Sequence, residues 1–188
     1  MLAHRGATKA LLVAAGICLA GAALAAAAKP VSVKWPGGQV TVDGRIEFKA
    51  RDKKVFLNFT KNVRATAKSE GQSIELHHAD AATAEVDSRW QFDTIKANGA
   101  VRFTVTRKNG EAVEKTSGKC DRVTVYNPAG KTLTGDQRFL VADLAGNVLL
   151  TMPAPKEAGP TAEPMTLEGD HGQVWLTAQG VEGTIAAE

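Results

Sequence analysis

Three histidines follow the apolar N-terminal stretch of the chain, and they are the first candidates for metal or acid–base chemistry. His77 and His78 are adjacent, and neighbouring side chains on a strand point to opposite faces. They therefore cannot both bind one metal ion without a kink, and His171 is far away in the sequence. The chain has no Cys-x-x-Cys, no His-Glu-x-x-His and no acidic calcium-binding loop. We predict no metal site and no cofactor.

Three carboxylates, Asp80, Glu85 and Asp87, have the residue type needed for glycoside hydrolysis, which uses a pair of acidic side chains. Surface carboxylates beside a turn explain them equally well. The serines lack the Gly-x-Ser-x-Gly context of a hydrolase nucleophile. We therefore predict that the protein is not an enzyme.

The tryptophans and the cysteine allow binding or structural roles. Trp35 and Trp175 are candidate platforms for stacking a sugar, whereas Trp90 is in phase with Phe92 and is expected in the core. Cys120 is the one cysteine beyond the N-terminal stretch, so an internal disulfide is excluded there. We expect Cys120 to be a small buried residue rather than a reactive thiol.

Residues 1–28 are typical of a secretory signal peptide. Arg5 and Lys9 precede the charge-free apolar run Leu11–Leu24, and small residues suitable for cleavage follow it. We expect a cleaved signal, with a retained N-terminal anchor as the alternative. Residues 29–188 would then form the exported single domain.

The charge of that domain argues against nucleic-acid binding. Arg5 and Lys9 lie in the signal, so the 23 basic residues fall to 21, against 20 acidic ones. An exported chain close to neutrality lacks the electrostatic attraction on which binding to a polyanion depends. We therefore expect no nucleic-acid partner.

Alternation of apolar and polar residues predicts strands throughout the domain. Val55, Leu57 and Phe59 share one parity, and the long run Ile95–Val105 repeats the pattern. A period of two places each apolar set on one sheet face, and no segment shows a helical period. The fold class is therefore predicted to be all-β.

Glycine pairs and prolines divide the strands. Asp43-Gly44 and Gly146-Asn147 are typical of tight turns. The segment 152–164 holds four of the seven prolines and is predicted to be an exposed loop. Val63, Val101 and Phe139 are each 38 positions apart, which suggests stacked β-hairpin repeats.

Three segments resemble the repeats of a known family. They are Phe59–Ala65, Ile95–Phe103 and Lys119–Gly135. In this order they are similar to the OstA-like family, which includes LptA-like and LptC-like proteins of lipopolysaccharide transport.

The third segment carries the most detailed match. Asp121 and Tyr126 correspond to a family strand that begins with Ala-Asp and contains Tyr, and Cys120 replaces the alanine. Leu133 and Gly135 correspond to the strand that follows. The Pro-rich loop after this segment departs from the family pattern.

The resemblance implies an open, twisted antiparallel β-jellyroll, V-shaped in section and located in the periplasm. It implies an apolar inner face that binds the acyl chains of lipopolysaccharide or a similar envelope glycolipid. The alternation places the candidate lipid-binding residues on one such face: Leu57, Phe59, Val63, Val101, Phe103 and Val125.

The resemblance also implies that the first and last strands pair with related β-jellyroll proteins or with a second copy. Such edges have unpaired backbone groups that accept another strand. The candidate contact residues are Val31, Val33, Val40 and Val42 in an N-terminal strand and Val174 and Leu176 in a C-terminal one.

Three functions remain open from the sequence. The first is carriage of an envelope lipid on the apolar face. The second is an interaction module whose apolar face is a closed core and whose edges bind proteins. The third is a secreted sugar-binding domain that uses Trp35 or Trp175.

Overall fold

One open antiparallel sheet of twelve strands forms the protein in the computed structural model. The structure describes the residues 29–35, 37–69, 71–87, 92–109, 112–126, 140–154, 162–176 and 181–187. Every regular element in these ranges is a strand, which confirms the predicted all-β class. The same ranges hold no helix suited to crossing a membrane. The predicted signal, residues 1–28, lies outside them.

Strand length changes sharply along the chain, from 5–7 residues in the first seven strands to 12–18 residues in the next four. The strands are β1 (Val31–Trp35), β2 (Gly38–Val42), β3 (Ile46–Arg51), β4 (Lys54–Thr60), β5 (Arg64–Ser69), β6 (Gln72–His78), β7 (Ala81–Asp87), β8 (Phe92–Asn109), β9 (Ala112–Tyr126), β10 (Leu140–Met152), β11 (Met165–Leu176) and β12 (Val181–Ala186). The predicted Pro-rich loop therefore falls between β10 and β11.

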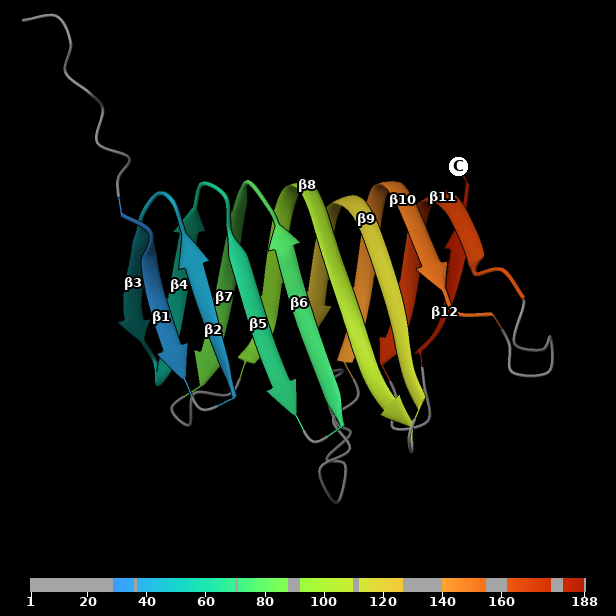
Figure 1. The fold of residues 1–188 in the computed structure, drawn as a ribbon. Helices are drawn as coiled ribbons and strands as arrows, with labels where there is room; N and C mark the ends of the chain where they lie inside the picture. Colours follow the sequence, from blue (N-terminus) through green and yellow to red (C-terminus); the bar gives the residue numbers. More distant parts are fainter. Residues whose placement is uncertain are drawn as a thin grey trace, which may run out of the picture.

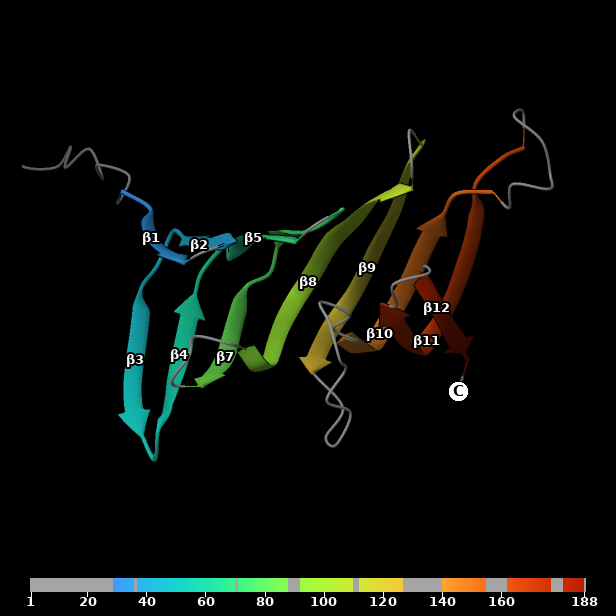
Figure 2. The ribbon, with the colours of Figure 1, turned by 90° about the horizontal axis from the view of Figure 1, so that it is seen from below.

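The sheet is folded into two layers that share the long strands. β8 pairs with β7 through Phe92–Asn98 and with β6 through Arg102–Arg107. The front layer in Figure 1 therefore contains β1, β2, β5 and β6, and the back layer contains β3, β4 and β7. The layers meet along the upper side of Figure 1, and Figure 2 shows them diverging. This arrangement agrees with the predicted open β-jellyroll.

The line along which the layers meet, here called the crease, is formed by pairs of residues with positive φ. The pairs are Lys61-Asn62 between β4 and β5, Gly99-Ala100 within β8 and Gly146-Asn147 within β10. Strand register shifts at the second and third pairs, because the extra residues form bulges that bend the strand. A buried valine follows each pair: Val63, Val101 and Val148.

The crease explains the internal repeat in the sequence. The segments around Val63 and Val101 occupy equivalent corners, as the repeat predicts. The third corner is at Val148, so the spacing of 38 residues is not kept, and Phe139 lies outside the described residues. The prediction that Gly146-Asn147 is a turn between strands was wrong, because β10 continues through the pair on both sides.

The N-terminal strand prediction needs correction. Val31 and Val33 do lie on β1, whose one partner among the described strands is β2. Val40 and Val42 lie on β2, between β1 and β5, and both are buried. They were predicted to be edge contacts, but Gly37 turns the chain into a hairpin and gives β2 an inner position. The other edge at this end is β3.

The C-terminal edge was also assigned to the wrong strand. Val174 and Leu176 lie on β11, which pairs with β10 on one side and β12 on the other. The chain returns after Leu176 and adds β12, so Val174 is a buried core residue. The edges at this end are β12 and the half of β11 from Met165 to Gly169, which pairs with β10 alone among the described strands.

Candidate functional site

All six predicted lipid-binding residues lie on the inner faces of the two layers. Leu57, Phe59, Val63 and Val101 are buried members of the core. Phe103 and Val125 are half-buried and pack against that core. The shared apolar face is therefore present, but four of its six members are covered by the opposite layer.

Burial on the inner face differs from strand to strand with distance from the crease. Along β4 it decreases from Phe59 through Leu57 to the half-buried Val55. Along β8, Val101 is fully buried and Phe103 is half-buried, but Val105, farther from the crease, is only 5% exposed. The two layers touch at the crease and separate beyond it, so the outer positions of β4 contact fewer atoms.

A strip of partly accessible apolar side chains results on the inner face, away from the crease. This apolar strip consists of Val55, Leu76, Ile95, Phe103 and Val125. Val86 and Val105 also lie far from the crease but are buried. Period two in the sequence places the strip on the correct face, but the sequence carries no signal for its distance from the crease.

Phe103 is held in place by a glycine on the neighbouring strand. Its register partner is Gly118, and a Cβ atom built on Gly118 would overlap the Phe103 ring. The ring therefore lies across the bare backbone of β9. Trp35 covers Gly38 in the same way and packs against the core, so the structure does not offer it as an exposed sugar platform.

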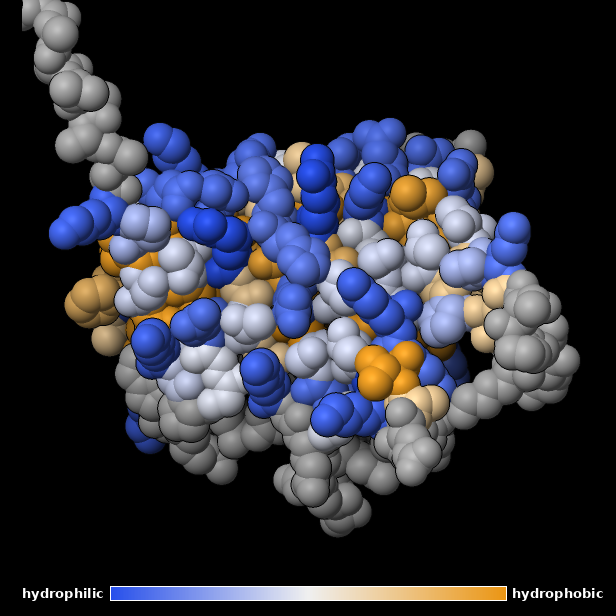
Figure 3. Space-filling model, in the orientation of Figure 1, coloured by the Kyte–Doolittle hydropathy of each residue, from blue (hydrophilic) through white to orange (hydrophobic). Residues whose placement is uncertain are grey.

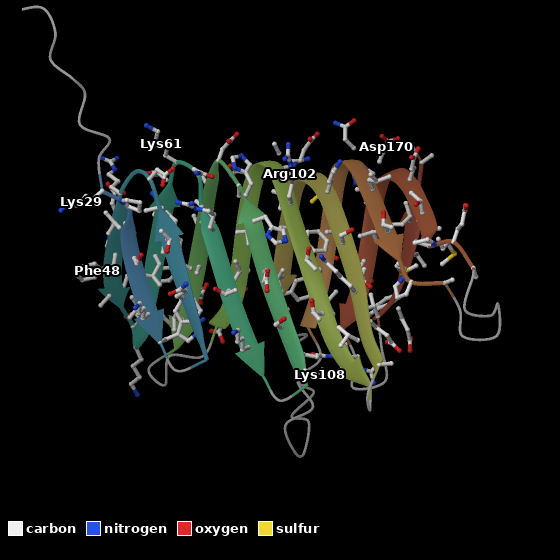
Figure 4. All side chains as sticks on the ribbon, in the orientation of Figure 1. Lys29, Phe48, Lys61, Arg102, Lys108 and Asp170 are labelled. Carbon is white, nitrogen blue, oxygen red and sulfur yellow. The ribbon has the colours of Figure 1, made fainter. Side chains whose placement is uncertain are left out.

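The inner face is exposed at the N-terminal end of the sheet. Phe48 on β3 is paired with the inward Leu57 but is 77% exposed. Figure 4 shows the Phe48 side chain projecting outward from the left end of the molecule. Lys61, Arg102 and Asp170 lie along the crease, at the upper side of the same view. In Figure 3 the front face is mainly hydrophilic, and hydrophobic colour reaches this same end. The edge prediction did not include Phe48.

The candidate histidines bind separate partners. His77 Nε2 lies 2.8 Å from Thr104 Oγ1. His78 contacts Asn62 through Nδ1 at 3.0 Å and Asp80 through Nε2 at 3.3 Å, at the crease. Among the described residues, no three His, Cys, Asp or Glu side chains gather in a way that would hold a metal ion.

The candidate carboxylates are likewise apart. Asp80 faces His78, whereas Glu85 pairs with Lys54, which also binds Asp93 at 3.2 Å. These contacts raise the pKa of Lys54, chiefly through the hydrogen bond to Glu85. The side chain of Asp87 lies outside the described side chains. Asp80 and Glu85 therefore have separate surface partners, and the structure does not bring the candidate carboxylates together as a pair.

Cys120 lies in the core beside the crease and is 3% exposed. Burial, followed by the negative charge of Asp121, raises the pKa of the thiol to about 11. The thiolate is the reactive form, so the native thiol is poorly nucleophilic at neutral pH.

We expect a disulfide reagent at pH 8 to modify Cys120 about a hundredfold more slowly in the folded chain than in guanidinium, in a Cys18→Ala background. The pKa of Cys120 is about 11 in the folded chain, against an ordinary value of 9.0. The protonated thiol therefore contributes to folding stability below pH 9, and this contribution to the free energy of unfolding is lost as the pH rises toward 11. Cys120→Ala should lack that part of the pH dependence. Equal labelling rates in both states would show that the thiol is accessible.

The chain matches no protein-family model, and no curated protein or solved structure matches it either. The resemblance to the OstA-like family therefore depends on the three sequence segments alone and stays a prediction.

Proposed function

We propose that the protein is a non-enzymatic lipid-binding protein that holds acyl chains against the apolar strip. The observation that carries the proposal is the loss of burial from Phe59 to Val55 along β4, together with the partial exposure of Phe103 and Val125 on the same inner side. An acyl chain in the strip would cover apolar surface that the opposite layer leaves accessible. Burial of such surface favours binding by about 25 cal/mol per Å².

The class of lipid and the location follow from the sequence resemblance. Lipopolysaccharide or a similar envelope glycolipid is the proposed ligand, and the periplasm is the proposed compartment. The exposed Phe48 and the edges β1 and β3 form one end of the sheet, and β12 with Met165–Gly169 forms the other. Among the described strands, each end has backbone groups with no strand partner, which could pair with a related protein or a second copy.

A closed-core interaction module is the second candidate. Leu57, Phe59, Val63 and Val101 favour it, because their burial leaves no room for a ligand beside them. In that case the apolar strip would be only the margin of the core. The open sheet ends would then carry the function.

Phe103→Ser separates the two candidates. If the strip binds lipid, the change should weaken uptake of a fluorescent fatty-acid probe about tenfold, because it removes apolar contact area. The unfolding midpoint should fall less than for a fully buried ring, since Phe103 is half-buried. Mass spectrometry of the purified protein should also detect extractable lipid.

Phe56→Ser is the matched control. It removes the same side chain from the outward face of β4, where Phe56 is 43% exposed, and should leave probe uptake unchanged. The lipid proposal fails if the unmodified protein neither retains lipid nor takes up the probe. It also fails if both variants reduce uptake equally.

A further inference from the structure

The outward face of the back layer carries a continuous row of register partners that crosses eight strands. The row starts at Lys49 on β3, ends at Glu182 on β12, and contains Phe56, Tyr126 and Trp175. Directly paired residues in an antiparallel sheet project to the same side. We call this set the aromatic row. It runs perpendicular to the strands.

A second row, one step closer to the crease, is entirely polar. This polar row includes Asn58, Thr83, Lys96, Thr124, Asp143 and Gln173. Glu47 on β3 is the register partner of Asn58 and begins this row. Two hydrogen bonds join neighbours within the row: Asn58 Nδ2 donates to Glu47 Oε2 at 3.2 Å, and Gln173 Nε2 donates to Asp143 Oδ1 at 2.7 Å. Amide, hydroxyl and carboxylate groups thus lie alongside the three rings.

The three aromatic rings of this row lie on different strands, so the distance between them is a whole number of strand spacings. Tyr126 and Trp175 are separated by two strand steps, which is about 10 Å at the usual strand spacing, and Phe56 and Tyr126 by three, about 14 Å. The first interval is comparable to the length of a β-linked disaccharide. Rings aligned at that interval match a repeating chain rather than a single small ligand.

The rings remain partly accessible, although they cover apolar surface. Phe56 is 43% exposed, and Tyr126 and Trp175 are half-buried. Val141 pairs with both Tyr126 and Trp175 and is only 4% exposed. Val141 belongs to no part of the inner core, so this is a separate apolar cluster on the outer face.

Tyr126 connects the two rows. Burial and then the charge of Asp143 raise the pKa of its hydroxyl; a hydrogen bond to Asp143 acts in the same direction, while one to Gln173 opposes it. The ring orientation is therefore set by polar groups of the neighbouring row. Such bracing gives a stacking platform a defined plane.

At the β3–β4–β7 end, the two rows border a shallow depression of about 430 Å³. Its lining includes Lys49 and Phe56 from the aromatic row and Glu47, Asn58 and Thr83 from the polar row. The remaining lining residues, Phe48, Leu57 and Ala84, form the register row between these two rows, and that row faces the inner side of the sheet.

We propose that this outward face binds a linear, uncharged, β-linked oligosaccharide, with sugar rings stacked on Phe56, Tyr126 and Trp175 and their hydroxyls bonded to the polar row. Sugar rings present apolar C–H faces to aromatic rings and hydroxyls at their edges. Lys49 and Lys96 face Glu85, Glu182, Glu47 and Asp143 on this side, and two of these acids are paired, Glu85 with Lys54 and Glu47 with Arg45. The face therefore has no excess of positive charge to attract an anionic chain. The site lies on the opposite side of the sheet from the apolar strip and is independent of lipid binding.

The test is calorimetric titration of the full chain with cellotetraose and with chitotetraose. We expect at least one of the two to bind, and Phe56→Ala to weaken its binding about fivefold to tenfold, as for loss of one stacked ring. Trp175→Ala should weaken it at least as much, with Trp175→Phe largely restoring it. Thermal unfolding of each variant checks that the sheet is intact.

Phe103→Ala is the matched control, because it removes a half-buried ring from the inner side of the sheet, away from both rows and from the depression. It should leave sugar binding unchanged. Absence of binding by both sugars at millimolar concentration overturns the proposal, as does equal binding by Phe56→Ala and the unmodified chain. Fatty-acid probe uptake is measured on the same samples, so failure of either proposal is seen separately.

Discussion

Phe59→Ala is expected to lower the free energy of unfolding by about 3–5 kcal/mol, the usual cost of deleting a buried aromatic side chain. Phe59 is 3% exposed and lies on the inner face of β4, next to the crease. The cavity would form where the two layers are in contact, so the backbone has little room to collapse. Urea unfolding monitored by tryptophan fluorescence measures the change.

Phe48→Ala serves as the control for this loss. It removes the same ring two register positions away along the inner face, but the ring is mostly in solvent. We expect a change within about 0.5 kcal/mol, as is usual for surface positions. If Phe59→Ala were as mild as Phe48→Ala, the layers would not be closed at the crease. The closed part of the core would then be open to ligand.

Gly99→Ala is expected to cost about 2–4 kcal/mol, through backbone strain and a steric clash. Gly99 has a φ of 79°, and a Cβ atom built there would overlap the carboxylate of Asp80. Asp80 is itself fixed by the crease, since its N–H donates to the carbonyl oxygens of Asn98 and Gly99. Relief of the clash therefore requires the corner to move.

The neighbouring residue provides the opposite test. Ala100 already has a φ of 46°, so Ala100→Gly removes strain at the same corner. We expect no loss of stability, or a gain of up to about 1 kcal/mol. Thermal unfolding of the two variants should thus move in different directions. Two equal losses would mean that the corner responds to any change in sequence and not to backbone conformation.

A second variant pair divides the Gly99→Ala effect into its two parts. In an Asp80→Gly background both the carboxylate and the Cβ atom of Asp80 that a new Cβ would meet are absent, while the positive φ of residue 99 remains. Gly99→Ala should then cost only the backbone part, about 1–2 kcal/mol. An unchanged cost in that background would assign the whole effect to φ.

The all-β class and the apolar face could be predicted from local pattern alone. Period two depends only on the pleat of a strand, so Leu57, Phe59, Val101 and Phe103 were placed on a common face without knowledge of their neighbours. The repeat around Val63 and Val101 was visible for a similar reason. Each corner needs a short left-handed pair and a small apolar residue after it.

The assignment of edges failed because an edge is a property of the whole sheet. Val40 and Val174 were assigned to edge strands because they lie near the two ends of the domain sequence. In the structure, the strand of Val40 lies between β1 and β5, and the strand of Val174 lies between β10 and β12. Local pattern does not reveal these second neighbours. Gly146-Asn147 has the composition of a turn and instead bends a continuous strand. The same two residues suit both structures, because both require positive φ.

Local pattern was enough to predict the strand class, the inward parity of the apolar residues and the repeat around Val63 and Val101, because these depend on the backbone preferences of neighbouring residues. Which of the inward residues are buried depends instead on how distant strands pack. Val101 and Phe103 have the same parity and differ by two positions, yet only Val101 is fully enclosed. The reason is geometric: the cover over each inward position comes from strands in distant parts of the chain, so it differs between neighbours of the same parity, and Val105 beyond Phe103 is again buried. Pairing across eight strands aligned Phe56, Tyr126 and Trp175 in the same way, since register between strands follows from long-range pairing.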